Sequence, residues 1–358
     1  MIKVLKYILV ALNVLAVLMM LVCAYSVYLH PVHYPNWSYF GMLFPIPLIV
    51  NVAFFFVWIF RPKTRYFLIP LAGMFLCMGA IKALLPINPF QGDPDGRTIK
   101  VLSYNVMMFD RVNADEAWED NEILRYILDS EADIVCLQEG ASYVENEPVK
   151  TLIGEKYDYI DICMSDTSSS VILSKFPVVS SAPIDIPSES NSSCAFTLLV
   201  GEDTMTVINN HLESYKLNDD DKEKYKEIFR DIRDRSGKEE IKENFWLLEE
   251  KLAKANQIRA VQADSIDAFV QRCTSKYIIS CGDFNDCPIS YVHRVMCNHL
   301  RDAYTESGNG LGLSYHRSGM YFRIDNILVS ENIKAYHAKV DDSVDRSDHY
   351  PILCTLEL

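Results

Sequence analysis

The sequence predicts a mixed α/β domain that follows three membrane-spanning helices. Two observations lead to this fold class. The first 86 residues contain three long apolar stretches and no acidic residue. From residue 98 to the C-terminus, short apolar runs alternate with helical patterns, which is typical of an α/β domain. The chain of 358 residues is long enough for both units.

The three apolar stretches are Tyr7–Leu29, Tyr39–Phe60 and Tyr66–Leu85. Each has roughly the 20 residues that a helix needs to cross a bilayer. The first stretch is too long for the apolar core of a cleaved signal peptide, and no small-residue cleavage site follows it. We therefore expect residues 1–85 to form a membrane anchor of three transmembrane helices, with the lipid bilayer as its partner.

The basic residues of this segment predict its orientation. Lys3 and Lys6 precede the first stretch, and RPKTR (Arg61–Arg65) joins the second to the third, whereas the loop between the first two has neither Lys nor Arg. The positive-inside rule then places the N-terminus and Arg61–Arg65 in the cytoplasm. Three spans place everything after Leu85 on the outer side, so we expect a periplasmic domain on a bacterial inner membrane. No obligate protein partner is expected.

The charge of the chain is concentrated in its second part. The net charge is −14, and all 48 acidic residues follow Pro86. Tight, sequence-independent binding of nucleic acid relies on Lys and Arg, so this composition disfavours a general polyanion-binding domain. Bound divalent cations would offset part of the negative charge locally.

The elements after the anchor follow from local patterns. Residues 86–97 are rich in Pro and Gly, and we predict a linker there. Helical periodicity predicts helices over Glu116–Ser130 and Ala255–Arg272. Ser214–Asn256 is a highly charged helical insertion that serves either as a lid or membrane-facing element or as a solvated excursion. Short apolar runs predict strands over Thr98–Tyr104, Asp133–Gln138, Ser170–Ser174, Thr197–Val200, Thr204–Asn209, Tyr277–Ser280, Ile324–Val329 and Pro351–Leu358.

Polar side chains stand at or beside the ends of these strands. The sequence GDFN (Gly282–Asn285) follows the run at Tyr277, and Phe284 should point into the core because side chains alternate along an extended backbone. Each polar residue alone fits an ordinary turn or cap, but the whole set at strand ends indicates one site. Its members are Asn105, Glu139, Asn210, His211, Asp283, Asn285, Asp325, Asp348 and His349.

These side chains suit the cleavage of a phosphoester with a hard metal ion. Mg²⁺ takes oxygen ligands and keeps several waters, so one or two carboxylates are enough to bind it. Asn105, Glu139 and Asp348 are the candidate ligands, with Mn²⁺ as an alternative to Mg²⁺. His211 and His349 suit contacts with phosphoryl oxygens or proton transfer, because imidazole titrates near neutrality.

The remaining candidates have roles in proton transfer and charge stabilisation. Asp325 is the candidate partner that sets the tautomer of His349 and stabilises its charged form. Asp283 is placed to orient or deprotonate the attacking water. Asn210 and Asn285 are candidate hydrogen-bond donors to charge that develops on phosphoryl oxygens. The predicted phosphate-binding set is therefore Asn210, His211, Asn285 and His349.

The order of these motifs resembles the endonuclease/exonuclease/phosphatase superfamily, which includes deoxyribonuclease I-like nucleases, neutral sphingomyelinases and inositol polyphosphate 5-phosphatases. The resemblance spans Thr98–Leu358 and rests on the motifs N, QE, NNH, GDFN, RID and SDH, which end at Asn105, Glu139, His211, Asn285, Asp325 and His349. It implies a four-layer α/β sandwich, in which two packed mixed sheets are flanked by helices, and Mg²⁺-dependent hydrolysis by water without a covalent intermediate.

The resemblance also implies residue roles. By motif position, Glu139 is the principal metal ligand, and Asn105 and Asp348 support the metal. Asp283 and Asn285 position water and phosphate, His211 contacts phosphate, and Asp325 pairs with His349. His211 stands where abasic-site endonucleases carry a Tyr-containing segment, which favours the nuclease, sphingomyelinase and phosphatase branches.

The predicted function is a membrane-anchored phosphoesterase that hydrolyses a phosphodiester, either nucleic acid or a phospholipid head group. Two alternatives stay open. One is a phosphomonoesterase of the inositol-phosphatase type, and the other is a catalytically inactive, membrane-tethered binding protein on the same fold. Loss of activity would be expected to remove at least one polar residue of the set, and all of them are present.

Overall fold

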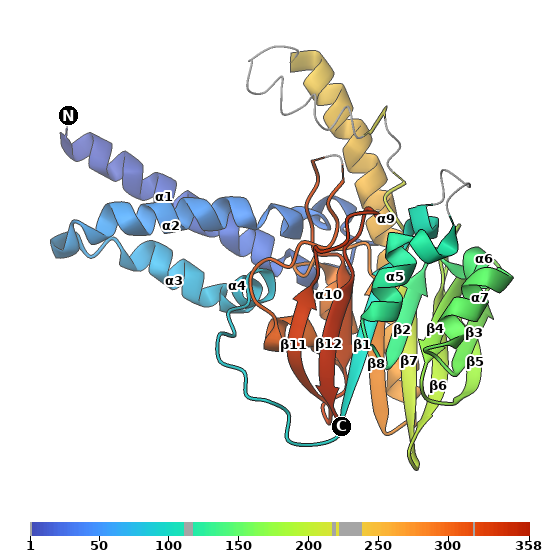
Figure 1. Ribbon diagram of the computed structural model, residues 1–358. Coiled ribbons are helices and arrows are strands. Elements are labelled where there is room, and N and C mark those ends of the chain that lie inside the picture. The colour runs from blue at the N-terminus through green and yellow to red at the C-terminus, as the bar shows by residue number, and fades with distance from the viewer. Residues whose placement is uncertain (1, 111–116, 217–219, 222–237, 318) are drawn as a thin grey trace.

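The computed structural model describes residues 2–110, 117–216, 220–221, 238–317 and 319–358. Two six-stranded sheets face each other and are covered by helices on their outer faces, while the N-terminal helices project to one side (Figure 1). This arrangement confirms the predicted sandwich of two mixed sheets flanked by helices.

The first sheet contains β1 (Thr98–Asn105), β2 (Ile134–Gln138), β3 (Tyr159–Met164), β4 (Ser169–Ser174), β11 (Lys334–Val340) and β12 (Ile352–Glu357). Its strand order is β11–β12–β1–β2–β4–β3. Only the pair β1–β2 is parallel among the pairings of this sheet, so both of these strands end at the same edge.

The second sheet contains β5 (Val178–Ile184), β6 (Ser193–Val200), β7 (Asp203–His211), β8 (Tyr277–Asp283), β9 (Arg301–Asp302) and β10 (Asp325–Val329). Its strand order is β5–β6–β7–β8–β10–β9, and β7 and β8 are parallel. Each predicted strand is present. The strands that the sequence did not reveal, β3, β5, β9 and β11, lie at the sheet edges, where many side chains are exposed or only partly buried and no continuous apolar run develops.

Three apolar clusters produce the layers of the domain. The first lies between the sheets and joins residues such as Val101, Val207 and Ile279. The second packs α5 (Glu122–Asp129), α6 (Ala141–Val144) and α7 (Glu147–Gly154) on the first sheet. The third packs α9 (Lys238–Arg272) and α10 (Tyr291–Met296) on the second sheet, and α11 (Ala303–Ser307) lies beside β11.

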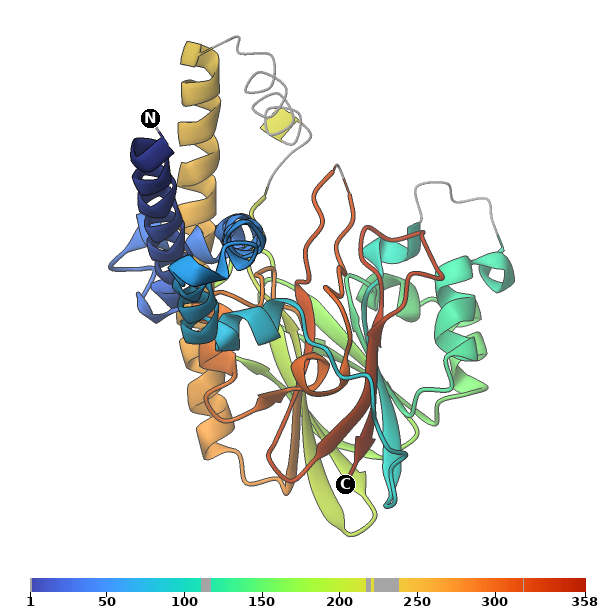
Figure 2. The same ribbon diagram turned by 90° about the vertical axis from the view of Figure 1, so that its left-hand side faces the viewer.

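The insertion differs from its prediction. The charged stretch up to Asn256 and the amphipathic stretch after it form one continuous helix, α9, of 35 residues. Its first half extends beyond the sheets, and its second half lies on the domain (Figure 2). Residues 217–219 and 222–237 of the predicted insertion lie outside the described residues.

The N-terminal helices are α1 (Ile2–Tyr25), α2 (Pro45–Ile59), α3 (Leu68–Leu76) and α4 (Met78–Leu84). The helices in the second and third apolar stretches are shorter than predicted, whereas α1 has about the predicted length. Among the described residues, one helix, Val4–Tyr28, is long and apolar enough to cross a bilayer. A second span arises only if Pro35–Leu43 and Pro45–Ile59, which meet at a 45° bend, act together. Helices of this length and composition also occur as signal sequences and as core helices of soluble proteins.

The prediction of three separate spans is therefore wrong, for two local reasons. Pro45 and Pro47 lie at the start of α2, where the ring is tolerated, so the regular helix begins there rather than at Tyr39. The third stretch is interrupted at Cys77, which separates α3 from α4. The nine residues of α3 extend only about 13 Å at 1.5 Å per residue.

The predicted linker is held against the α/β domain. Residues 85–97 form no helix or strand. The Asn88 side chain donates to Gly308 O at 2.7 Å and to Thr305 O at 3.2 Å, and Gly310 N donates to Pro86 O at 3.0 Å. These contacts tie the start of the linker to α11 and the loop after it.

Gly282 is the backbone position that most constrains the end of β8. Its φ is +126°, and a Cβ atom placed there would lie 2.0 Å from the carbonyl oxygen of Asn210 on β7. An L side chain is therefore excluded both by conformation and by space. The missing side chain lets β7 and β8 pair closely up to the partners His211 and Asp283.

Replacing Gly282 with Ala is expected to lower the free energy of unfolding by at least about 2 kcal/mol, because the new Cβ meets backbone that cannot move without breaking the β7–β8 pairing. Thermal unfolding of the full-length protein measures the change. Gly154→Ala is the matched control, since a Cβ at Gly154 meets no atom within 4 Å. Equal unfolding temperatures for the two variants would contradict this interpretation.

Candidate active site

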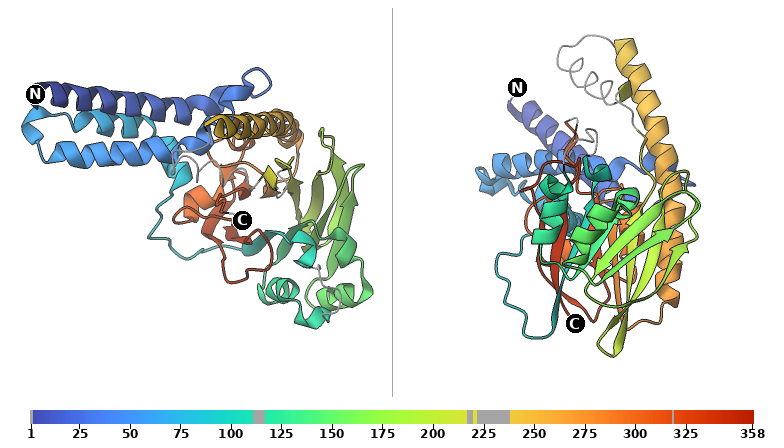
Figure 3. Two further views of the ribbon diagram at one scale, coloured as in Figure 1. Left: turned by 90° about the horizontal axis from the view of Figure 1, so that it is seen from above. Right: turned by 45° about the vertical axis from the view of Figure 1, so that its right-hand side comes forward.

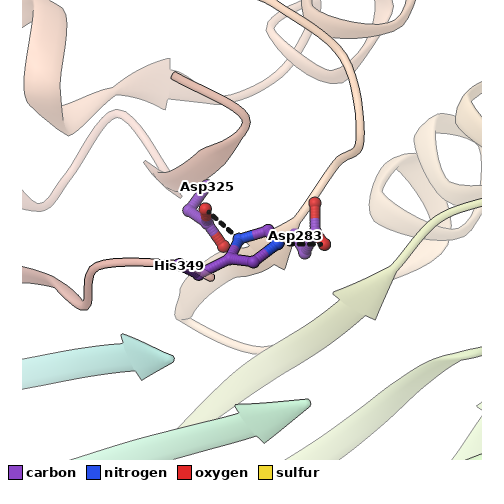
Figure 4. A group of neighbouring side chains, drawn as sticks. All are labelled: Asp283, Asp325 and His349. Atoms are coloured by element: carbon purple, nitrogen blue, oxygen red, sulfur yellow. Dashed lines mark hydrogen bonds and ion pairs between the residues drawn. The ribbon is translucent and has the colours of Figure 1, made fainter. Parts of the chain in front are cut away.

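The candidate residues come together at one end of the sandwich because of strand direction and register. The parallel pairing of β7 with β8 places His211 beside Asp283, and the antiparallel pairing of β8 with β10 places Asp283 beside Asp325. On the first sheet, Asn105 is the last residue of β1 and pairs with Gln138, directly before Glu139. His349 lies just before β12 and points at the second sheet (Figure 4).

Asp325, His349 and Asp283 form a buried row of charged groups (Figure 4). The Nδ1 atom of His349 is 2.8 Å from Asp325 Oδ2, and its Nε2 atom is 3.6 Å from Asp283 Oδ2. Burial alone would lower the pKa of His349, but the two carboxylates raise it to about 10. His349 is therefore a cation near neutral pH, held between two acids.

Asp283 is the most contacted carboxylate of the site. It accepts hydrogen bonds from Asn105 Nδ2 at 3.3 Å, from Asn285 N at 2.8 Å and from Asn285 Nδ2 at 3.2 Å. Burial raises the pKa of Asp283 to about 6, although His349 opposes the shift. A carboxylate with this pKa is mostly ionised at pH 7 and can accept a proton from water.

Asn285 orients the site from a strained backbone position. Its φ is +51°, and its side-chain amide donates to Leu212 O at 3.0 Å as well as to Asp283. The amide hydrogens that were predicted to bind phosphate are thus directed to groups of the protein itself. This geometry fits a role in fixing the Asp283 carboxylate.

Glu139 lies on the solvent-accessible side of the site. It follows β2 with a φ of +58°, and its side chain is 36% exposed, in contrast to 2% for Asp283. Its Oε1 atom accepts a hydrogen bond from Asn105 Nδ2 at 3.2 Å. Burial raises the pKa of Glu139, and the nearby charge of Asp348 adds to this effect while Asn105 and His349 oppose it.

The donor set around Glu139 fits a divalent cation. Glu139 and Asp348 are close enough for repulsion to raise the pKa of Glu139, and a bound cation would relieve that repulsion. Oxygen donors on a partly open position are what Mg²⁺ or Mn²⁺ requires. The Asn105 oxygen accepts from Met107 N at 3.2 Å, so Asn105 acts first as a bridge between the Glu139 and Asp283 carboxylates.

Asp283, Asp325 and His349 also present ligand atoms within 4.8 Å of one another, a spacing that would suit a metal ion. The 2.8 Å hydrogen bond between His349 and Asp325 occupies the Nδ1 atom, and the raised pKa of His349 keeps the ring protonated. A protonated imidazole is not a ligand. These groups therefore hold a proton in preference to a metal.

His211 lies between the two acidic parts of the site. Its Nε2 atom is 3.7 Å from both Glu139 Oε1 and Asp283 Oδ2. Burial lowers the pKa of His211, although the Asp283 charge opposes the shift. A mostly neutral imidazole at this point is available to donate a hydrogen bond to a bound anion.

Asn210 does not join the site, which corrects its predicted role in phosphate binding. Because side chains alternate along β7, Asn210 points to the face opposite His211. Its amide donates to Ser280 Oγ and Cys281 O at 2.9 Å and accepts from Ser193 Oγ at 2.9 Å. These bonds tie β7 to its neighbours β6 and β8.

Two supporting residues were not singled out from the sequence. Ser347 donates to Asn105 O at 2.7 Å and accepts from His349 N at 3.1 Å, which joins the start of β12 to the end of β1. The Tyr315 ring contacts the His349 ring edge-on at 5.2 Å. Ser347 directly precedes Asp348 in the SDH motif, so the sequence could have indicated its place near the site. No sequence pattern indicated Tyr315.

Comparison with known proteins identifies the family. The model of the "Endonuclease/Exonuclease/phosphatase family" matches residues 102–349, and a model described as "Domain of unknown function (DUF8431)" matches residues 6–84. No curated protein matches the sequence.

Two solved structures show the shared fold. A humanized D. rerio TDP2 is 15% identical with a TM-score of 0.50, and the match covers 73% of this chain and 99% of that one. ANGEL2, described as a 2′,3′-cyclic phosphatase in complex with adenosine-2′,3′-vanadate, is 14% identical with a TM-score of 0.50, and the match covers 76% and 99%. Since the family model spans more than half of the chain and contains the whole site, the chain belongs to the endonuclease/exonuclease/phosphatase family.

Proposed function

We propose that this protein is a metal-dependent phosphoesterase that cleaves a phosphodiester by direct attack of water. The observation that carries the proposal is the buried row of Asp325, His349 and Asp283 beside the open Glu139 carboxylate. It combines a fixed cation, a carboxylate that can accept a proton and an oxygen ligand for a metal within one site.

Asp283, His349 and His211 have different roles in the proposed reaction. Asp283, whose carboxylate is fixed by Asn105 and Asn285, accepts the proton of the attacking water. His349, kept charged by Asp325, donates a hydrogen bond from Nε2 to a phosphoryl oxygen as negative charge develops. His211 donates to a second phosphoryl oxygen.

Glu139, Asp348 and the amide of Asn105 would hold Mg²⁺ or Mn²⁺. The ion would supply charge stabilisation for the phosphoryl group and the leaving oxygen. Burial is the main cause that raises the pKa of Glu139, and the charge of Asp348 adds to it; a bound cation would stabilise the ionised form of both carboxylates, which supports this assignment.

The N-terminal helices support a membrane location. α1, α2 and α3 pack against one another and run away from the sheets side by side (Figure 3). Exposed apolar side chains line them, including Phe56 of α2 and Phe75 of α3. We assign α1 as the spanning helix of this anchor, with the N-terminus in the cytoplasm and the catalytic domain on the outer side. A substrate at a membrane surface, such as a phospholipid head group, then becomes the first choice over nucleic acid.

Full-length protein with Mg²⁺ or Mn²⁺ is expected to hydrolyse one class among DNA, RNA, sphingomyelin, glycerophospholipids and inositol phosphates. Chelation should remove the activity. Glu139→Gln should lower turnover by about 10²-fold or more and weaken Mn²⁺ binding measured by calorimetry, because the amide loses the ligand charge. Full activity of this variant would overturn the metal assignment. Hydrolysis of monoesters alone would select the phosphatase alternative, and metal binding without hydrolysis would select the inactive one.

Asp325→Asn is expected to lower kcat by about 10²-fold, because the neutral amide no longer keeps His349 in its charged form. Steady-state kinetics on the substrate found above measure the effect. Asp345→Asn is the matched control: Asp345 forms a similar pair with His316 Nε2 at 2.7 Å, but it is 63% exposed and outside the site. Similar losses in both variants would argue against a specific role of Asp325.

A protease added outside spheroplasts is expected to digest the catalytic domain, since the proposed topology places it on the outer surface. Immunoblotting with antibodies to the C-terminus follows the digestion, and a cytoplasmic marker protein must remain intact. A catalytic domain that is digested only after lysis would reverse the proposed orientation.

A further inference from the structure

We propose that residues 38–44, in the connection between α1 and α2, are a positioning element of the active site. This inference rests on the proposed phosphoesterase function. Residues 38–44, the docking segment, turn from the apolar helices onto the catalytic domain. There they meet α9 and the loops that follow β7 and β8, the strands that carry His211 and Asp283.

The first contact is a close approach of two backbones. A Cβ atom at Gly41 would lie only 1.7 Å from the carbonyl oxygen of Ile289. Ile289 is buried in one apolar cluster with Met20 and Phe44 of the N-terminal part. Because Ile289 belongs to the loop that begins with Asn285, the position of the docking segment limits the path of that loop.

The second contact is a chain of hydrogen bonds through α9. Asn256 Nδ2 donates to Ser38 Oγ at 2.8 Å, and Asn256 Oδ1 accepts from the Arg259 guanidinium. Arg259 is fully buried; it donates to Glu213 O at 2.7 Å, and its Nε lies 3.6 Å from Asp286 Oδ2. One buried cation thus holds two loops, and its own position is set by Asn256.

Both loops held by Arg259 lie next to groups of the site. Glu213 lies just after His211, and Asp286 directly follows Asn285. The two loops are also joined to each other, since Leu212 N donates to Asp283 O at 2.9 Å and Asn285 Nδ2 donates to Leu212 O. A shift of Arg259 would therefore move His211 and the partners of Asp283 together.

A further contact of the N-terminal part reaches β10. Arg323 is 2% exposed, and its guanidinium donates to Ala83 O at the end of α4 and to Leu311 O at 3.2 Å. Arg323 precedes Asp325 in the RID motif. The N-terminal part thus contacts the loops beside each of the site strands β7, β8 and β10.

Such contacts matter for catalysis because reacting groups must be held to fractions of an ångström. A misplacement of about 1 Å by a change outside the chemistry can cost about 10²-fold in rate. If the docking segment only attached the domain to the N-terminal helices, its contacts would not need to converge on the loops that follow His211 and Asp283.

Gly41→Ala in the full-length protein tests the proposal, with Gly73→Ala as its matched control. A Cβ at Gly73 would also be crowded, at 2.8 Å from Val17 Cγ1 and 3.0 Å from Met20 Cε, but it would meet side chains of α1 and not the backbone of the loop after β8. Two readouts are taken: kcat and KM for bis(4-nitrophenyl) phosphate with Mn²⁺, and hydrogen exchange of peptides over residues 205–215 and 277–290. For Gly41→Ala we expect kcat to fall about 10-fold or more with KM nearly unchanged, and faster exchange in both peptides.

A second pair of variants tests the interface from α9. Asn256→Ala removes the bonds to Ser38 and Arg259 and should reproduce both effects. His30→Asn also disturbs a contact with α9, the 3.0 Å pair with Asp264, but Asp264 bonds to Tyr291 of α10 and not to Arg259, so kcat and the exchange of residues 205–215 should stay unchanged.

Unchanged exchange in both Gly41→Ala and Asn256→Ala would overturn the proposal, as would equal effects of the control variants. Faster exchange without a loss of kcat would mean that the docking segment attaches the N-terminal helices to the domain but does not position the active site. A wild-type protein that cleaves no phosphoester would refute the proposed function instead, and the exchange measurement would still decide whether the docking segment holds the loops.

Discussion

Burial of the Asp283 carboxylate is the constraint on which the rest of the site depends. A charge at this depth is costly unless hydrogen bonds and counter-charges surround it. Asn105 and Asn285 supply the hydrogen bonds, and His349 supplies the positive charge. His349 in turn needs Asp325 to remain charged. The hydrogen bonds and the positive charge that stabilise the buried Asp283 carboxylate therefore also fix its position in the site.

The sequence predicted the interior of the fold better than its periphery. Central strands such as β2 and β8 are buried along their whole length, so they appear as uninterrupted apolar runs. Edge strands such as β3 and β5 are partly exposed and lack this signal. The pattern of apolar residues along a strand follows from which of its side chains are buried. Burial differs between the centre and the edge of a sheet, so the two kinds of strand differ in their sequence pattern.

Prediction of the site had a similar limit. Strand ends located Asn105, Glu139, His211, Asp283, Asp325 and His349 correctly at one end of the sandwich. The same logic failed for Asn210, because neighbouring residues of a strand point to opposite faces. Contacts between distant segments, such as Arg259 with Glu213 or Arg323 with Ala83, leave no pattern along the chain and required the structure.

The pairing of β1 with β12 has a consequence for how the protein is made. β1 follows the N-terminal helices in the sequence, whereas β12 ends at Glu357, and Thr98 is paired with Glu357 itself. During synthesis the N-terminal helices leave the ribosome before β1, and β1 has no partner on that side until β12 has emerged. His349, at the entrance to β12, arrives with it. The site is therefore assembled only after β12 has been synthesised, and a chain that stops before His349 lacks one of the buried charged groups of the site.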